Sequence, residues 1–111
     1  MKEWVMRYWD EKKGRSSIER WLDKLDKEHL KSVSKEIKIL SKIGNELKLP
    51  HSKPLKSGLF ELRDRRFGYR LYYCFYGEYV IVLLAAGDKS GQQNDIKIAR
   101  ERLKIIEKEG L

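Results

Sequence analysis

The 111-residue sequence is poor in the residues that build several common kinds of protein site. Its single cysteine, Cys74, excludes an intramolecular disulfide framework and a zinc site made from clustered cysteines. Its two histidines, His29 and His51, are far apart along the chain, which argues against a histidine-based metal site. We therefore expect neither a metal ion nor another cofactor to take part in the function.

Long apolar runs are absent as well. The most apolar segment, residues 79–86, has the length of a strand and is far too short to cross a membrane. Residues 1–3 lead into a charged, mixed segment instead of the apolar stretch of a secretory signal. The sequence therefore predicts a cytoplasmic protein without a membrane partner.

Acidic residues are in clear deficit. The chain has 25 Lys and Arg against 17 Asp and Glu, for a net charge of +8. The excess is greatest in residues 51–76, where six basic residues stand against two acidic ones. A surface with this charge favours an anionic partner: nucleic acid, an acidic protein, or both.

The first half of the chain predicts one strand followed by two helices. Residues 3–9 alternate in the manner of a strand. A capping box, formed by Ser16 and Glu19, then begins an amphipathic helix. A second amphipathic helix begins near Glu28 and ends at Gly44, a residue type that commonly terminates helices.

The second half predicts three strands and a closing helix. Residues 46–58 read as a loop, and strands follow at 59–64, 69–76 and 79–86. The last of these is continuously apolar, so we expect it to be central and covered. The closing helix is indicated by apolar residues at helical spacing, namely Ile96, Ala99, Leu103 and Ile106.

The resulting order, β-α-α-β-β-β-α, predicts an α+β fold in a single domain over residues 1–111. We expect a mainly antiparallel sheet flanked by a helical hairpin and a C-terminal helix. Basic side chains alternate with apolar ones through residues 51–89, which favours a sheet with one buried face and one cationic face. A cationic sheet face is well suited to a phosphate backbone.

Four segments of the second half form a specific pattern when they are taken together. They are KPL at 53–55 with GLFELR at 58–63, GYRLYY at 68–73, VIVLL at 80–84 with GDKS at 87–90, and DI at 95–96. In order and spacing they resemble the RelE/ParE superfamily of toxins from bacterial toxin–antitoxin modules. The resemblance is greatest to its RelE/HigB-like members, which include addiction module killer and phage Gp49-like proteins. The N-terminal half matches only by its β-α-α order.

This resemblance implies a function and its partners. It implies the toxin of a type II toxin–antitoxin module, a metal-independent endoribonuclease that cleaves mRNA on the ribosome, blocks translation and arrests growth. A small cognate antitoxin would neutralise it, and DNA would be contacted only indirectly, through the antitoxin. ParE-type relatives share the fold but inhibit DNA gyrase, so a gyrase inhibitor is one alternative and a non-toxic basic RNA-binding module is another.

Cleavage of RNA without a metal uses the RNA's own 2′-hydroxyl as the nucleophile, so the protein must stabilise the negative charge that develops on phosphorus. If strand 59–64 pairs with strand 69–76, Arg63 and Arg70 lie side by side on the polar face. An ion pair between Arg70 and Glu61 is an alternative that is compatible with catalysis. With lysines from the preceding loop and from the end of the next strand, we expect a catalytic cationic cluster made of Arg70, Lys89, Arg63, Lys53 and Lys56.

Other residues are candidates for RNA contacts. Arg65 and Arg66 lie in the predicted hairpin loop, where they either contact RNA or are simply solvated. Tyr72 shares a strand face with Arg70, and as an exposed aromatic residue it is a candidate for stacking on a base. His51 is a candidate acid, base or RNA contact, with a solvated surface residue as the alternative.

The sequence departs from the resembled family in one respect. Active RelE-like nucleases often place a tyrosine or histidine at the start of the last helix or at the chain end, as an acid–base group. Here residues 92–96 read QQNDI and residues 108–111 read KEGL. Either a lysine or His51 takes that role, or cleavage is weak, or the chain acts on gyrase or is degenerate. Asp95 is interpreted as a cap of the last helix.

Overall fold

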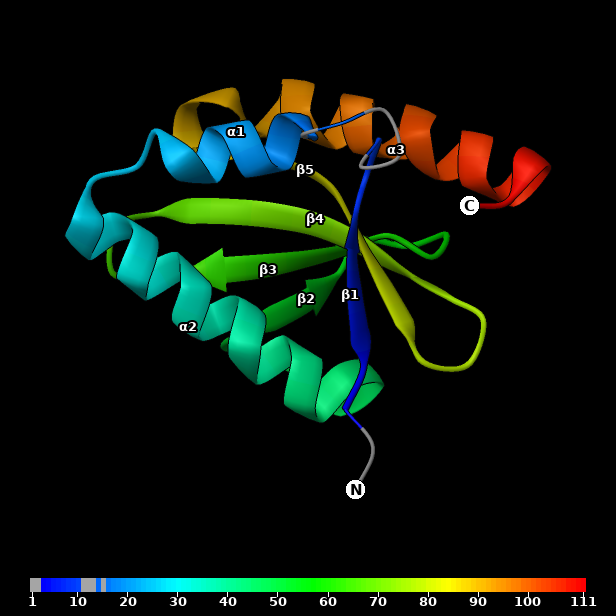
Figure 1. Cartoon of the computed structure of the whole chain (residues 1–111), viewed down its shortest axis with the longest axis horizontal. Helices are drawn as coiled ribbons and strands as arrows, with labels where there is room; N and C mark the ends of the chain where they lie inside the picture. The colour runs from blue at the N-terminus through cyan, green and yellow to red at the C-terminus, as the bar shows by residue number, and fades with distance from the viewer. Residues whose placement is uncertain (1–2, 11–13, 15) are drawn as a thin grey trace.

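The structure, a computed structural model, describes residues 3–10, 14 and 16–111. A five-stranded sheet lies at its centre, with helices on both faces (Figure 1). The strands are β1 (Val5–Tyr8), β2 (Ser52–Pro54), β3 (Phe60–Asp64), β4 (Tyr69–Tyr76) and β5 (Val80–Asp88). The helices are α1 (Ser17–Asp23), α2 (Lys27–Ile43) and α3 (Gln92–Glu109), with short 3-10 turns η2 (Gly44–Glu46) and η3 (Lys89–Gly91).

The strand order across the sheet is β1-β5-β4-β3-β2. β1 runs parallel to β5, and the other neighbouring pairs are antiparallel. The α+β class and the mainly antiparallel sheet are therefore confirmed. The apolar strand is also central, as predicted, because β5 lies between β1 and β4 and its fully buried residues are Ile81, Val82, Leu83 and Leu84.

Two strand predictions are wrong in detail. β2 falls inside the segment predicted as a loop, so the chain has one strand more than the predicted order. This strand lies at the edge of the sheet, where proline is tolerated, and it contains Pro54. Its three residues leave little pattern in the sequence. β5 also continues past its predicted end, because Gly87 and Asp88 pair with Arg70 and Tyr69 of β4.

The helix ends agree with their sequence signals. The Ser16 hydroxyl accepts a hydrogen bond from the backbone N–H of Glu19 at 3.1 Å, and the Glu19 carboxylate accepts one from the Ser16 N–H at 3.4 Å. This confirms the predicted capping box. Gly44 ends α2 with a φ of +64°, in the left-handed region that favours glycine.

The core has two parts, one on each face of the sheet. On one face α1 and α2 cover the strands, and its buried residues are Ile18, Val33, Leu40, Leu62, Leu71, Tyr73, Ile81 and Leu83. On the other face α3 covers them, and its buried residues are Leu59, Tyr72, Cys74, Val82, Leu84, Ala85, Ala99, Leu103 and Ile106. Figure 1 shows α2 and α3 on opposite sides of the sheet.

The position of α3 changes one expectation about the sheet. The predicted division into one buried face and one cationic face is wrong, because α3 covers the middle of β4 and β5 on the side that was expected to be cationic. Charged side chains on this face remain beside the first turn of α3, where residues from β3, β4 and α3 meet. The candidate site described below lies there.

Candidate functional site

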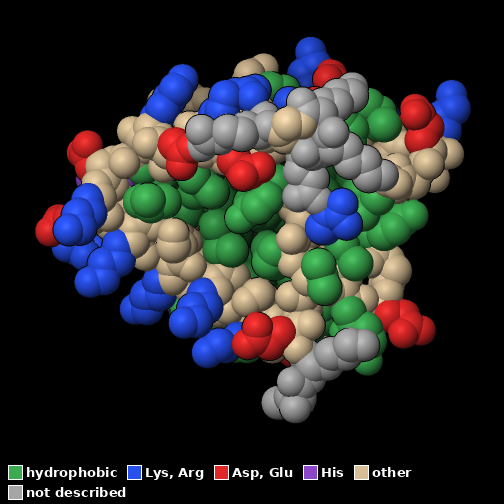
Figure 2. All heavy atoms as spheres, in the orientation of Figure 1, with side chains coloured by type: hydrophobic (Ala, Val, Ile, Leu, Met, Phe, Trp, Pro, Cys, Tyr) green, Lys and Arg blue, Asp and Glu red, His purple; other side chains and the backbone are tan. Residues whose placement is uncertain are grey.

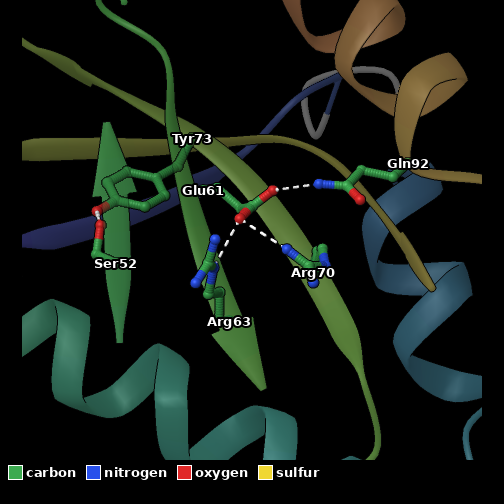
Figure 3. Close-up of polar contacts among 6 residues, drawn as sticks. All are labelled: Ser52, Glu61, Arg63, Arg70, Tyr73 and Gln92. Atoms are coloured by element: carbon green, nitrogen blue, oxygen red, sulfur yellow. Dashed lines mark hydrogen bonds and ion pairs between the residues drawn. The ribbon is translucent and has the colours of Figure 1, made fainter. Parts of the chain in front are cut away.

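The centre of the candidate site is the buried carboxylate of Glu61, the second residue of β3 (Figure 3). Oε1 of Glu61 accepts one hydrogen bond from Nε of Arg63 at 2.8 Å and another from Nη1 of Arg70 at 2.9 Å. Oε2 accepts a hydrogen bond from Nε2 of Gln92, in the first turn of α3, at 3.0 Å. A charge that is removed from water needs such partners, and Glu61 has them on three sides.

The register of the sheet explains why these side chains meet. Glu61 lies opposite Lys53 on β2, and Arg63 lies opposite Arg70 on β4. Residues directly opposite each other on neighbouring strands share a face, so all four side chains lie on the same face as α3. Two predictions are therefore confirmed: Arg63 and Arg70 are neighbours, and Arg70 forms a cross-strand ion pair with Glu61.

The arginines keep hydrogen-bond donors that no group of the described residues uses. Arg63 contacts Glu61 through Nε, and none of the described residues accepts a hydrogen bond from its two terminal nitrogens. Nε of Arg70 is buried and has no hydrogen-bond partner among the residues that the structure describes. The side chains of Arg63 and Arg70 are 28% and 20% exposed, so solvent reaches both. An anion that approaches this face would meet two guanidinium groups whose positions are already fixed.

The predicted lysines differ in how closely they approach this centre. Lys53 is exposed and is the cross-strand partner of Glu61. Lys89 is exposed at the start of η3 and lines a shallow surface hollow together with Gln92. Lys56 lies in the loop after β2, where its carbonyl accepts a hydrogen bond from Arg100 of α3 at 3.3 Å. Its side chain has no contact that joins it to the two arginines.

Tyr72 corrects the prediction most clearly. Its side chain is fully buried in the core beneath α3, so the expectation of an exposed ring that stacks on a base is wrong. Its hydroxyl is also buried, and no group in the described part of the chain forms a hydrogen bond with it. Burial, and next the charge of Glu61, raise the pKa of this hydroxyl well above its ordinary value. Tyr72 thus belongs to the buried core next to the site.

His51 is not brought into the cluster. Its Nδ1 lies 2.8 Å from Oε1 of Glu36, so the imidazole ring contacts α2. Its backbone carbonyl accepts a hydrogen bond from the N–H of Arg63, and this contact helps to hold the end of β3 in place. On the opposite face of the sheet, the hydroxyls of Ser52 and Tyr73 are hydrogen-bonded and tie β2 to β4 (Figure 3).

Asp95 does not cap α3, as the sequence had suggested. The N-cap residue is Gly91, and the Asp95 carboxylate lies against the backbone of Gly87. A Cβ atom added to Gly87 would lie 2.1 Å from Oδ2 of Asp95, so only glycine leaves room for it there. Burial, and next the charge of Asp88, raise the pKa of Asp95.

Arg65 and Arg66 are exposed at the turn between β3 and β4. The Arg66 guanidinium lies 4.8 Å from the ring centre of Phe67 and 3.9 Å from Oε2 of Glu28. Both arginines line a groove between this turn and α2, and the residues on its α2 side are Lys27, Glu28, Lys31, Ser32, Lys35 and Glu36. Figure 2 shows a row of Lys and Arg side chains over α2. This groove was not predicted as a unit, because it joins residues that are distant in the sequence.

Two further findings concern the described ranges. Their His, Cys, Asp and Glu residues form no group of three or more that could hold a metal ion. None of their helices is long and apolar enough to cross a membrane.

Comparisons with known proteins agree with this architecture. The family model "Phage derived protein Gp49-like (DUF891)" matches residues 20–107. An uncharacterized protein of Haemophilus influenzae is 37% identical over 86 residues, which are 76% of this chain and 83% of that protein.

Solved structures of a bacterial toxin share the fold. A mutant of the E. coli toxin RelE in the free state aligns with a TM-score of 0.65 at 13% identity, over 91% of this chain and 98% of that one. The isolated E. coli RelE toxin aligns with a TM-score of 0.55 at 15% identity, over 86% of this chain and 98% of that one. The chain therefore belongs to the Gp49-like family, and its fold is similar to that of the E. coli toxin RelE.

Proposed function

We propose that this protein is the toxin of a type II toxin–antitoxin module and that it cleaves mRNA on the ribosome without a metal. The observation that carries the proposal is the pair of arginines held on one buried carboxylate at a solvent-accessible face, with guanidinium nitrogens that donate to none of the described residues. The RelE-like fold and the net charge of +8 support it.

The chemistry follows from these groups. In the reaction, the 2′-hydroxyl of the RNA loses its proton and attacks the neighbouring phosphorus, and the bond to the leaving 5′-oxygen breaks as that oxygen gains a proton. Arg63 and Arg70 would stabilise the negative charge on the phosphate oxygens, since preorganised donors aimed at developing charge are usually the largest catalytic contribution. Lys53 and Lys89 would add positive charge and take part in the proton transfers.

The partners follow from the same surface. A protein with this excess of positive charge binds an acidic or amphipathic segment rapidly, which is the property that an antitoxin needs. We place the cognate antitoxin and ribosome-bound mRNA as the direct partners, in the cytoplasm, with DNA reached only through the antitoxin. Arg65 and Arg66 would contact RNA outside the reacting phosphate.

One observation favours a second candidate function. The first turn of α3 carries Gln92, Gln93, Asn94 and Asp95, and so it contains neither a tyrosine nor a histidine. A protein that inhibits DNA gyrase by binding needs the fold and the charge but no acid–base group, so a ParE-like inhibitor is the alternative.

The direct test uses the purified chain and ribosomes programmed with a defined mRNA. We expect cleavage within the ribosome-bound message, and we expect Arg70→Ala to lower the rate by about 100-fold, as the loss of one preorganised donor does elsewhere. Lys104→Ala, which removes an exposed charge from α3, is the matched control and should leave the rate unchanged. Intact mRNA together with inhibited gyrase supercoiling would favour the alternative.

A further inference from the structure

Burial of a carboxylate at position 61 costs free energy of folding. The Glu61 side chain, at the second residue of β3, is 1% exposed, and its cross-strand neighbour on β4 is the fully buried Tyr72. A buried ion pair is seldom better for stability than well-packed apolar side chains of similar volume. A carboxylate here therefore suggests a role beyond holding the fold together.

The hydrogen bonds of Glu61 fix how the arginines are turned. A single oxygen, Oε1, accepts from both guanidinium groups, so the two groups converge on one point. Arg63 is held by Nε, and none of the described residues accepts a hydrogen bond from its two terminal nitrogens. A planar guanidinium held in this way offers its remaining donors in a fixed direction, the arrangement that suits recognition of a phosphate by paired hydrogen bonds.

Gln92 fixes the carboxylate itself. Its side-chain amide donates to Oε2, the oxygen that the arginines do not use, so the carboxylate cannot rotate without losing a contact (Figure 3). Gln92 is the first residue of α3 and lines the same surface hollow as Lys89. Glu61 therefore joins the two arginine-bearing strands to the helix beside them.

We infer that Glu61 is a positioning residue of the RNA-cleaving site: it orients the Arg63 and Arg70 guanidinium groups toward the reacting phosphate. This inference rests on the proposed function. The role has a cost in binding, because the negative charge of Glu61 cancels part of the attraction between two guanidinium groups and a phosphate. Orientation and affinity are thus opposed at this residue, and a substitution can separate them.

Glu61→Gln separates the effect of this residue on the orientation of the arginines from its effect on affinity. It keeps the shape of the side chain, removes the negative charge and places an amide N–H where a carboxylate oxygen faced a donor. We expect the protein concentration that gives half of the maximal cleavage rate to fall several-fold, because the RNA phosphate is attracted more strongly. We expect the maximal rate to fall by about 10- to 100-fold because misplaced catalytic groups lose rate even at small displacements. A merely structural role would not produce tighter binding with slower cleavage.

The experiment measures single-turnover cleavage of a defined mRNA on programmed ribosomes over a range of protein concentrations. Binding of a 2′-O-methylated RNA oligonucleotide, which cannot be cleaved in this way, gives the affinity separately by fluorescence anisotropy. Glu61→Asp keeps the charge but is too short to reach both arginines, so it should slow cleavage without tightening binding. Glu78→Gln, the same charge change at the exposed turn after β4, is the matched control and should leave both quantities unchanged.

The outcomes separate the inference from the function on which it rests. If the wild-type protein cleaves and Glu61→Gln retains the wild-type rate, the inference is wrong and the proposed function stands. If the wild-type protein cleaves no mRNA, both are wrong. If Glu61→Gln does not fold, Gln92→Ala replaces it, because this change leaves the charges and frees Oε2. We then expect a reduced maximal rate at unchanged affinity, and an unchanged rate would overturn the inference.

Discussion

At the scale of single residues, Gly44 shows how one position joins a helix end to the core. Its φ of +64° is unfavourable for any residue with a Cβ atom. A Cβ atom there would also lie 1.9 Å from Nε1 of Trp4, and Trp4 packs against Phe75 and Tyr79. The glycine is therefore required both by the turn and by the ring that lies on it.

Gly44→Ala should consequently lower the free energy of unfolding by about 2–5 kcal/mol, from left-handed backbone strain of about 1–2 kcal/mol and overpacking of about 1–3 kcal/mol. Gly77→Ala is the matched control, because Gly77 has a φ of +62° but no atom within 4 Å of an added Cβ. It should cost only about 1–2 kcal/mol. Urea denaturation measures both, and equal losses would show that contact with Trp4 is unimportant.

The same scale shows how far site residues could be predicted. Alternation along β3 placed Glu61 and Arg63 on one face, and the register then confirmed Arg63 beside Arg70. Burial could not be predicted in the same way. Alternation gives the face of Tyr72 but does not say that α3 lies over it, because that depends on contacts between distant segments.

At the scale of elements, the bounds of helices and strands were predicted correctly where they depend on neighbouring residues in the sequence. The capping box and the terminal glycine fixed the start of α1 and the end of α2, and the aromatic-rich strand β4 has the bounds that its pattern predicted. β2 was missed because its three residues gain their structure from pairing with β3, with no pattern of their own. Asp95 was assigned as a cap for a related reason, since α3 begins earlier than its apolar spacing shows.

The start of α1 gives a test at this scale. Ser16→Ala removes the hydroxyl that accepts from the N–H of Glu19, and we expect a loss of stability of about 1 kcal/mol. Ser34→Ala makes the same change at an exposed position inside α2, where alanine is the better helix former, so it should be neutral or slightly stabilising. Thermal unfolding of the two variants measures the difference, and equal shifts would contradict the role of the cap.

At the scale of the whole molecule, charge is distributed over two surfaces. One is the arginine site beside the first turn of α3, and the other is the groove between α2 and the β3–β4 turn. Within the described residues no ion pair engages Lys27, Lys31 or Lys35. The three acidic residues of the groove are all engaged: Glu28 lies near Arg66, Glu36 contacts His51, and Asp64 accepts hydrogen bonds from Ser32 and Phe67. The groove therefore keeps an excess of positive charge.

We expect this groove to contribute affinity but not chemistry. A triple variant, Lys27→Ala, Lys31→Ala and Lys35→Ala, should weaken ribosome binding and reduce its salt dependence, since each lost phosphate contact lowers the slope by about 0.7–0.9. The maximal cleavage rate should stay the same. Lys97→Ala, Lys104→Ala and Lys108→Ala remove the same charge from exposed positions on α3 and serve as the control. Equal weakening by the two sets, measured by co-sedimentation at several salt concentrations, would mean that net charge alone matters.

The most direct measurement of the central claim is induction of this chain alone in a bacterial host, with mapping of mRNA 5′ ends beside an Arg70→Ala control. We predict growth arrest with new in-frame ends within translated messages, and both effects should be lost in the variant. Growth arrest with intact mRNA, or new ends that persist at full strength in Arg70→Ala, would contradict the assignment of this arginine site as an RNA-cleaving centre.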